Sequence, residues 1–270
     1  MWHRTIDCLG LAVAVTSPLP ELAAQLTAVL GTYAETSRPA DLVYQLDRGE
    51  YPQVVRGGQV VSAHDTPNDL VPALELDLYR AVISAVPGLV LHASALVGSS
   101  GAAIVFAGRS GAGKSTLVRA LLARGFRYLS EECVALFANQ RCLGLARSLH
   151  VDDAAIALPD GYTSDDYVLR GRVGAPLRLF HPPEHVMWRG EAGTAAVVVI
   201  DHRPDADGAL VRLSSGAALA ALWPTVFQQD AGALDLATAG LDGVPTFQLH
   251  TSRPEQALER ALALANELGV

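Results

Sequence analysis

The chain has 270 residues, of which 50% are hydrophobic and 18% are charged, so it is long enough for one large domain or two smaller ones. This composition excludes a disordered chain, because disordered segments combine low hydrophobicity with high charge. The net charge of −8 predicts no broad basic surface for nucleic acid or an anionic membrane. We therefore expect any anionic ligand to be held by a local arrangement of residues.

The three cysteines, Cys8, Cys133 and Cys142, are far apart and form no C-x-x-C pair, so neither a disulfide framework nor a cysteine zinc site is predicted. The apolar run 9–15 lacks the small-residue cleavage site of a signal peptide and is interpreted as a strand. No stretch reaches the ~18 continuous apolar residues that a membrane span needs. The sequence predicts a soluble, cytoplasmic protein.

Residues 1–88 predict a small α+β unit. A strand at 10–15 is followed by a helix that starts at two prolines and ends near residue 31. Residues 41–63 predict strands joined by tight turns. A proline at the first helical position then opens a helix over 66–86.

Residues 89–270 alternate between strand and helix patterns, which favours an α/β fold. Strands are expected at 89–96, 102–107, 127–130, 134–137, 142–145 and 195–200, with a helix at 114–124. Residues 150–193 are rich in Gly, Pro, Asp and Arg and are interpreted as loops around a site. Further helices are predicted from Ser214 to Leu222 and after a capping box formed by Ser252 and Glu255.

The strongest functional signal is a complete G-x-x-x-x-G-K-[ST] motif, which lies between an apolar strand pattern and a helical pattern. Its residues are Gly108, Arg109, Ser110, Gly111, Ala112, Gly113, Lys114 and Ser115, followed by Thr116. In such a loop, backbone N–H groups converge on an anion and the helix N-terminus adds partial positive charge. The motif predicts that Lys114 reaches the β- and γ-phosphates of ATP and that the Ser115 hydroxyl binds Mg²⁺.

Lys114 is the only lysine among the 20 basic residues, so every other cation is an arginine. A compact ammonium on a thin stem fits a phosphate-binding loop, whereas a planar guanidinium does not. This strengthens the prediction of a nucleotide site over that of a glycine-rich turn without a ligand.

Phosphoryl transfer also needs a carboxylate for Mg²⁺ and a group that activates the nucleophile. Glu131 and Glu132 follow the strand pattern at 127–130, at the carboxyl edge where open α/β sheets place their ligands. The alternative is an exposed acidic turn. His92 lies in the apolar strand that precedes the motif strand, and an isolated histidine there is more often a core residue than a catalyst.

Three segments together resemble the HPr kinase/phosphorylase family, and more narrowly the HPr-kinase-like proteins of bacterial peptide-modification clusters such as those of lasso peptides. The segments are Leu91-His92-Ala93-Ser94, residues 102–116, and residues 124–132, which end in the paired acids. The resemblance implies a P-loop kinase core akin to phosphoenolpyruvate carboxykinase, and an ATP- and Mg²⁺-dependent kinase acting on a serine of a peptide or protein.

Within this resemblance, the family's histidine corresponds to His92 and its paired aspartates correspond to Glu131 and Glu132. We assign Glu131 as the base for the hydroxyl, aided by His92, and Glu132 as the Mg²⁺ ligand. Two glutamates in place of aspartates lengthen each arm by a methylene, and a shift of ~1 Å can reduce the rate ~10²-fold. The family's second signature is echoed only at Arg170 and Arg172. Residues 1–88 are not the N-terminal domain of the HPr kinases proper, which makes HPr an improbable substrate.

Three other patterns each have a functional and a purely structural interpretation. Asp201 follows a buried strand, as in the second nucleotide motif of many P-loop ATPases, but the segment is also an ordinary turn. His181 and His185 have zinc-like spacing, yet prolines between them prevent a helix and no third ligand is near. Cys133 lies beside the acids, whose charge disfavours a thiolate nucleophile.

The leading hypothesis is a cytoplasmic peptide or protein serine kinase whose substrate and oligomeric state the sequence does not specify. The alternatives are a kinase for a small molecule and a non-catalytic nucleotide-binding partner in a peptide-modification pathway.

Overall fold

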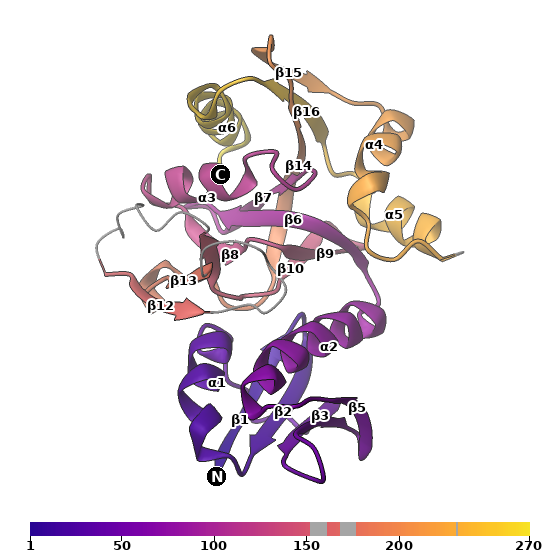
Figure 1. Ribbon diagram of the computed structural model, residues 1–270. Coiled ribbons are helices and arrows are strands. Elements are labelled where there is room, and N and C mark those ends of the chain that lie inside the picture. The colour runs from indigo at the N-terminus through magenta and orange to yellow at the C-terminus, as the bar shows by residue number, and fades with distance from the viewer. Residues whose placement is uncertain (152–160, 168–176, 231) are drawn as a thin grey trace. The chain divides into compact units, whose positions relative to one another are not determined.

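The structure is a computed structural model of a mixed α/β protein with three β-sheets, and it describes residues 1–151, 161–167, 177–230 and 232–270 (Figure 1). Contacts divide the chain into two compact units. The first comprises Met1–Ala85 and Ala146–Pro183, and the second comprises Val86–Leu145 and Glu184–Val270. In the part of the chain that the structure describes, no helix is both long enough and apolar enough to cross a membrane.

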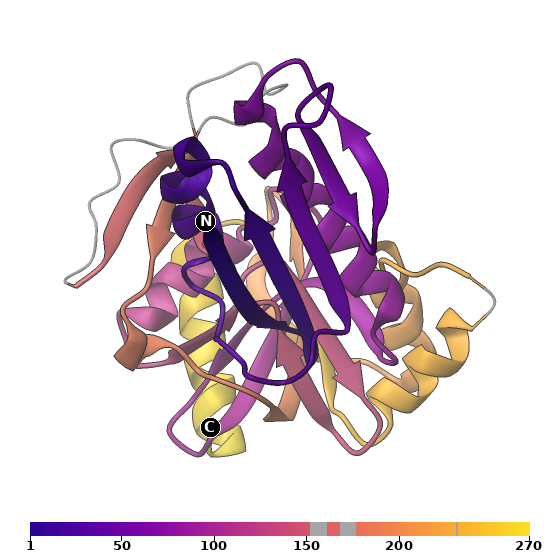
Figure 2. The same cartoon turned by 90° about the horizontal axis from the view of Figure 1, so that it is seen from below.

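The first unit contains a five-stranded sheet in the order β1-β2-β3-β4-β5, whose strands lie side by side in indigo and purple in Figure 2. Its strands are β1 (Trp2–Cys8), β2 (Leu11–Ser17), β3 (Leu42–Asp47), β4 (Gln53–Arg56) and β5 (Gln59–Ala63). The helices of this unit are α1 (Ala23–Leu30), which follows the short 3₁₀ turn Pro20–Leu22, and α2 (Leu70–Ala85), which follows the 3₁₀ turn Pro67–Asp69. Apolar side chains alternate along β3, where Tyr44 and Leu46 are buried and Val43 is exposed.

The second segment of this unit forms a three-stranded antiparallel sheet, which corrects the prediction of loops over 150–193. Its strands are β11 (Leu149–Val151), β12 (Thr163–Tyr167) and β13 (Leu177–His181), in the order β11-β13-β12. The sequence predicts a second domain over 89–270, whereas the contacts of the chain group Ala146–Pro183 with Met1–Ala85. Arg147 Nη2 lies 2.6 Å from Glu75 of α2, and the Ser148 hydroxyl lies 3.4 Å from that of Thr32 and 2.9 Å from His181 Nδ1. These polar contacts are not visible in a linear sequence pattern.

The second unit is built on an eight-stranded mixed sheet in the order β10-β9-β6-β7-β14-β16-β15, with β8 also paired to β6. Its strands are β6 (Leu89–Val97), β7 (Ala102–Ala107), β8 (Arg127–Ser130), β9 (Cys133–Phe137), β10 (Arg141–Gly144), β14 (Ala192–His202), β15 (Asp207–Arg212) and β16 (Thr246–Thr251). β7, β14 and β16 are mutually parallel, so their carboxyl ends meet at one edge. β6 runs antiparallel to β7, β8 and β9.

Helices cover both faces of this sheet (Figure 1). α3 (Lys114–Leu122) and α6 (Pro254–Leu268) pack against each other on one face. α4 (Ser215–Leu222) and α5 (Ala233–Leu241) cover the other face, where a continuous apolar core joins them to the strands. Burying both faces explains why the strand residues are almost uniformly apolar.

The strand and helix patterns predicted at 10–31, 41–86 and 89–145 are confirmed within a few residues. β1, β15, α5 and β16 were not predicted. The predicted capping box at the start of α6 pairs Ser252 with Glu255, and this pairing is wrong. The amide of Ser252 donates to Gln256 Oε1 at 3.2 Å instead. The residue that precedes α6 is Arg253, which makes no side-chain capping bond.

Candidate active site

The G-x-x-x-x-G-K-S segment occupies the predicted setting, a turn over residues 108–113 between the end of β7 and the first residue of α3. Gly113 has a φ of 93°, which a side chain disfavours, and directly precedes the helix. A Cβ on Gly108 would lie 3.1 Å from the carbonyl oxygen of Ile200, so the turn passes close to β14. Lys114, Ser115 and Thr116 form the first turn of α3, where backbone N–H groups have no intrahelical acceptor.

Lys114 is only 7% exposed and its ammonium points back at the turn. Its Nζ donates to the carbonyl oxygens of Gly108 at 2.8 Å and Arg109 at 3.3 Å. Burial lowers the pKa of Lys114 below its usual value, while the negative charges of Glu132 and Glu131 act in the opposite direction. The ammonium therefore lies within the electrostatic reach of both predicted acids.

The register of β6 explains how these residues meet. Ala93 of β6 pairs with Ala107, the last residue of β7, while Ala95 pairs with Ser130, the last residue of β8. Since β7 and β8 run in the same direction on either side of β6, their carboxyl ends lie at the same edge of the sheet. The turn at 108–113, the paired acids and His92 therefore gather there.

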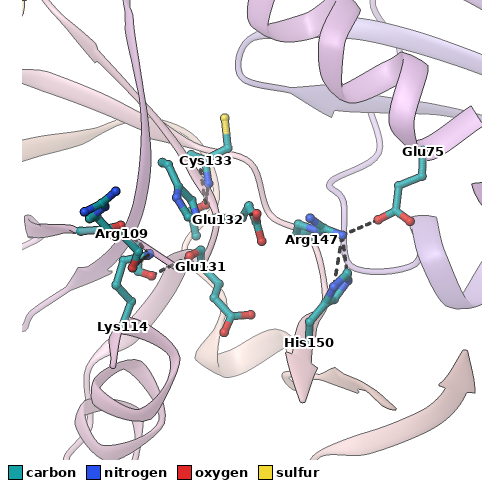
Figure 3. A network of polar contacts seen from close by, with 12 residues as sticks. Glu75, Arg109, Lys114, Glu131, Glu132, Cys133, Arg147 and His150 are labelled. Carbon is teal, nitrogen blue, oxygen red and sulfur yellow. Dashed lines mark hydrogen bonds and ion pairs between the residues drawn. The ribbon is translucent and has the colours of Figure 1, made fainter. Parts of the chain in front are cut away.

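Figure 3 shows Lys114, Glu131 and Glu132 at this edge, with Lys114 on α3. Glu131 is 7% exposed, whereas the side chain of Glu132 is 38% exposed. His92 Nε2 lies 3.6 Å from a carboxylate oxygen of Glu132. Burial and the positive charge of Lys114 lower the pKa of His92, and Glu132 partly opposes them, so the imidazole is neutral at pH 7.

The donor set fits Mg²⁺. The carboxylate of Glu132 and the exposed hydroxyl of Ser115 offer hard oxygen ligands, which Mg²⁺ prefers. Among the residues that the structure describes, no group of three or more His, Cys, Asp or Glu side chains forms a dedicated metal cage. Mg²⁺ usually takes one or two protein oxygens and completes its coordination with substrate phosphates and water.

Asp201 is the second-to-last residue of β14 and lies at the same sheet edge, because Val199 pairs with Ala107. Its carboxylate is engaged by three neighbours: Arg203 at 2.6 Å, His250 Nδ1 at 3.0 Å and Gln248 at 3.1 Å. Burial would raise the pKa of Asp201, but the hydrogen bonds and charges of Arg203 and His250 outweigh it and lower the pKa. The negative charges that act on Lys114 come from Glu132 and Glu131, which favours those two as the acids nearest the turn over residues 108–113.

Two residues that lie near Asp201 and His92 were not singled out by any sequence pattern. His250 of β16 contacts Asp201 across 49 positions, and the ring centroid of Phe227 lies 5.9 Å from that of His92. Arg170 and Arg172 lie outside the described residues. His181 contacts Ser148 and Asp165, the latter at 3.0 Å from Nε2.

The three cysteines are buried free thiols. Burial raises the pKa of Cys142 to about 11, so that thiol stays protonated at neutral pH.

No model of a known protein family matches the chain, and no curated protein is similar enough to match it. Comparison with solved structures finds the Hpr(Ser) kinase/phosphatase from Coxiella burnetii, with 14% sequence identity and a TM-score of 0.34. The match covers 66% of this chain and 98% of that chain. A similarity this low does not extend the activity of that protein to this chain.

Proposed function

We propose that the chain is an ATP-dependent kinase that transfers the γ-phosphate to a serine hydroxyl of a peptide or protein. The observation that carries the proposal is the meeting of Lys114, Glu131, Glu132 and His92 at one sheet edge, beside a phosphate-binding turn. A buried ammonium flanked by two carboxylates is the arrangement that phosphoryl transfer needs on the protein side.

The triphosphate would be bound by the backbone N–H groups of the turn and the first turn of α3. Lys114 would exchange its contacts with the carbonyls of Gly108 and Arg109 for contacts with the phosphate oxygens. Its ammonium would stabilise the negative charge of the terminal phosphate.

Glu132 and Ser115 would hold Mg²⁺, which neutralises charge on the β- and γ-phosphate oxygens when it is bound. Glu132 suits this role because its side chain is 38% exposed and leaves room for a hydrated metal, whereas Glu131 is only 7% exposed. His92 Nε2 lies 3.6 Å from the same carboxylate.

Glu131 would accept the proton of the serine hydroxyl as the hydroxyl oxygen attacks the γ-phosphorus. The bond between that phosphorus and the β–γ bridging oxygen breaks, and ADP leaves. Because Glu131 is only 7% exposed, the proton would be taken inside a site from which most water is excluded. Neutral His92 would be available as a second proton acceptor near Glu132.

The test is incubation of the purified chain with γ-labelled ATP, Mg²⁺, an arrayed library of serine peptides and a panel of small alcohols. Label on serine peptides supports the proposal. Label transferred only to free alcohols identifies a small-molecule kinase. Tight ATP binding without transfer or hydrolysis identifies a nucleotide-binding accessory protein.

A further inference from the structure

The backbone that carries Glu131 and Glu132 crosses a gap between two ladders of the sheet. β6 pairs with β8 through Ala95 and Ser130, and it pairs with β9 through His92 and Cys133. Between these two pairs, Glu131 and Glu132 are the only residues on the segment that joins β8 to β9. Ala93 and Ser94 are the only residues between the pairs on β6. We call residues 130–133 the acidic turn.

Within this gap, β6 holds both acids by their carbonyl oxygens. The amide of Ala93 donates to the carbonyl of Glu132 at 3.2 Å. The next bond comes from a side chain instead of the backbone, since the hydroxyl of Ser94 donates to the carbonyl of Glu131 at 2.6 Å. Ser94 is completely buried, so water does not compete for this bond.

The other side of the acidic turn is fixed in a similar way. The hydroxyl of Ser130, also completely buried, lies 2.8 Å from the carbonyl of Cys133 and 3.1 Å from that of Leu145. The amide of Cys133 in turn lies 3.3 Å from the Ser130 hydroxyl. Two buried hydroxyls therefore bracket the acids, and only that of Ser94 contacts the backbone of an acid itself.

We propose that Ser94 is a positioning residue, which sets the place of Glu131 and Glu132 through the carbonyl of Glu131. The proposal rests on the proposed function, because the acids matter for activity only if they serve phosphoryl transfer. Replacing Ser94 by alanine removes the buried donor to the carbonyl of Glu131, so the backbone at Glu131 can shift although the bonds of Ala93 and Ser130 remain. A shift of ~1 Å in a reacting group can lower a rate by ~10²-fold.

The experiment compares Ser94→Ala with Thr225→Val as a matched control. Thr225 is also buried in the second unit, and its hydroxyl donates to the carbonyl of Leu222 at 2.7 Å. Each substitution thus removes one short buried hydroxyl–carbonyl bond, but only Ser94 contacts the acidic turn. Ser94→Cys, whose thiol is a weak donor of similar size, is the second variant in case the alanine variant does not fold.

The first readout needs no activity: amide hydrogen exchange of a peptide spanning 129–134. We expect exchange to be at least ~5-fold faster in Ser94→Ala. In that variant the acidic turn can open without breaking the hydrogen bond to the carbonyl of Glu131. We expect no change in Thr225→Val and an intermediate rate in Ser94→Cys. The second readout is transfer from ATP, where kcat should fall ~10- to 100-fold in Ser94→Ala with KM for ATP within ~2-fold.

Exchange that is unchanged in Ser94→Ala, or a kcat equal to that of Thr225→Val, overturns the positioning role even if the wild-type chain is a kinase. A loss of kcat accompanied by an equal rise in KM for ATP also overturns it, because that pattern reports a damaged nucleotide site. If the wild-type chain transfers no phosphate at all, the proposed function fails. The exchange measurement then still shows whether Ser94 holds the turn.

Discussion

The imidazole Nε2 of His92 lies 3.6 Å from a carboxylate oxygen of Glu132, yet the pKa of His92 is lowered rather than raised. Burial is the largest cause and the nearby charge of Lys114 is the next, and together they outweigh Glu132. The pair is therefore a neutral imidazole beside a carboxylate at pH 7, which suits a proton acceptor.

This shift predicts how stability depends on pH. Well above about pH 6.5, His92 is neutral in both the folded and the unfolded chain, and its contribution does not change. As the pH falls below that value, the unfolded chain takes up the proton first, so the free energy of unfolding falls until the lower folded-state pKa is passed. Urea unfolding at a series of pH values should show this loss in the wild-type chain and a smaller one in His92→Gln. Identical pH dependence in the two proteins would contradict the assigned shift.

Lys114 should be irreplaceable. Lys114→Ala removes the charge next to the terminal phosphate, and we expect transfer from labelled ATP to fall by at least ~10²-fold. Lys114→Arg should also be impaired, because a planar guanidinium does not fit the space around the carbonyls of Gly108 and Arg109. Arg124→Ala, which removes an exposed cation just after α3, is the control and should keep its activity. An active Lys114→Arg enzyme would show that charge alone is sufficient.

The two acids should have separable effects. Glu132→Gln is expected to raise the Mg²⁺ concentration needed for half-maximal activity, because it weakens a metal ligand. Glu131→Gln is expected to lower the maximal rate ~10²- to 10⁴-fold at saturating Mg²⁺, because it removes the proton acceptor. Titrating Mg²⁺ for both variants tests this division. The same Mg²⁺ dependence in both would refute the assignment of roles.

Asp201 is the alternative candidate for the carboxylate that binds Mg²⁺. Its carboxylate is already engaged by Arg203, His250 and Gln248, so we expect Asp201→Asn to leave the Mg²⁺ requirement within ~2-fold of wild type. Titrating Mg²⁺ for Asp201→Asn beside Glu132→Gln shows which of the two carboxylates binds the metal. A Mg²⁺ requirement that rises in Asp201→Asn and not in Glu132→Gln would move the metal to the end of β14.

Gly144 should be required for the close packing against Leu129 and Ser130. A Cβ at this position would overlap the carbonyl oxygen of Leu129 and lie 2.7 Å from Cβ of Ser130. Gly144→Ala should therefore lower the free energy of unfolding by about 1–3 kcal/mol, which is the usual effect of overpacking. Gly193→Ala on β14, where an added Cβ meets nothing within 4 Å, is the matched control. Equal denaturation midpoints for the two variants would contradict this close contact.

The turn over residues 108–113 could be predicted from sequence because the strand before it and the helix after it are contiguous with it over residues 102–122. β1 was missed because Arg4 and Asp7 interrupt its apolar residues, of which only Ile6 and Cys8 are buried. That strand forms because it pairs along its whole length with β2. Such pairing is a tertiary effect that a local pattern does not contain.

The same distinction holds for the candidate site. Glu131 and Glu132 could be predicted because they follow a recognisable strand, but their distance from Lys114 depends on the register of β6 with β7 and β8. The contacts of His250 and Phe227 join segments distant in the chain and have no counterpart in spacing. The buried hydroxyl of Ser94 resembles any other serine in an apolar strand until its acceptor is known.

The most direct test is a crystal structure with a non-hydrolysable ATP analogue and Mn²⁺, whose anomalous signal locates the metal. The account predicts the β- and γ-phosphates in the turn at 108–113, the metal within coordination distance of Glu132 and Ser115, and the carboxylate of Glu131 facing the γ-phosphate. A metal bound at Asp201, or both glutamates turned away from the terminal phosphate, would contradict it.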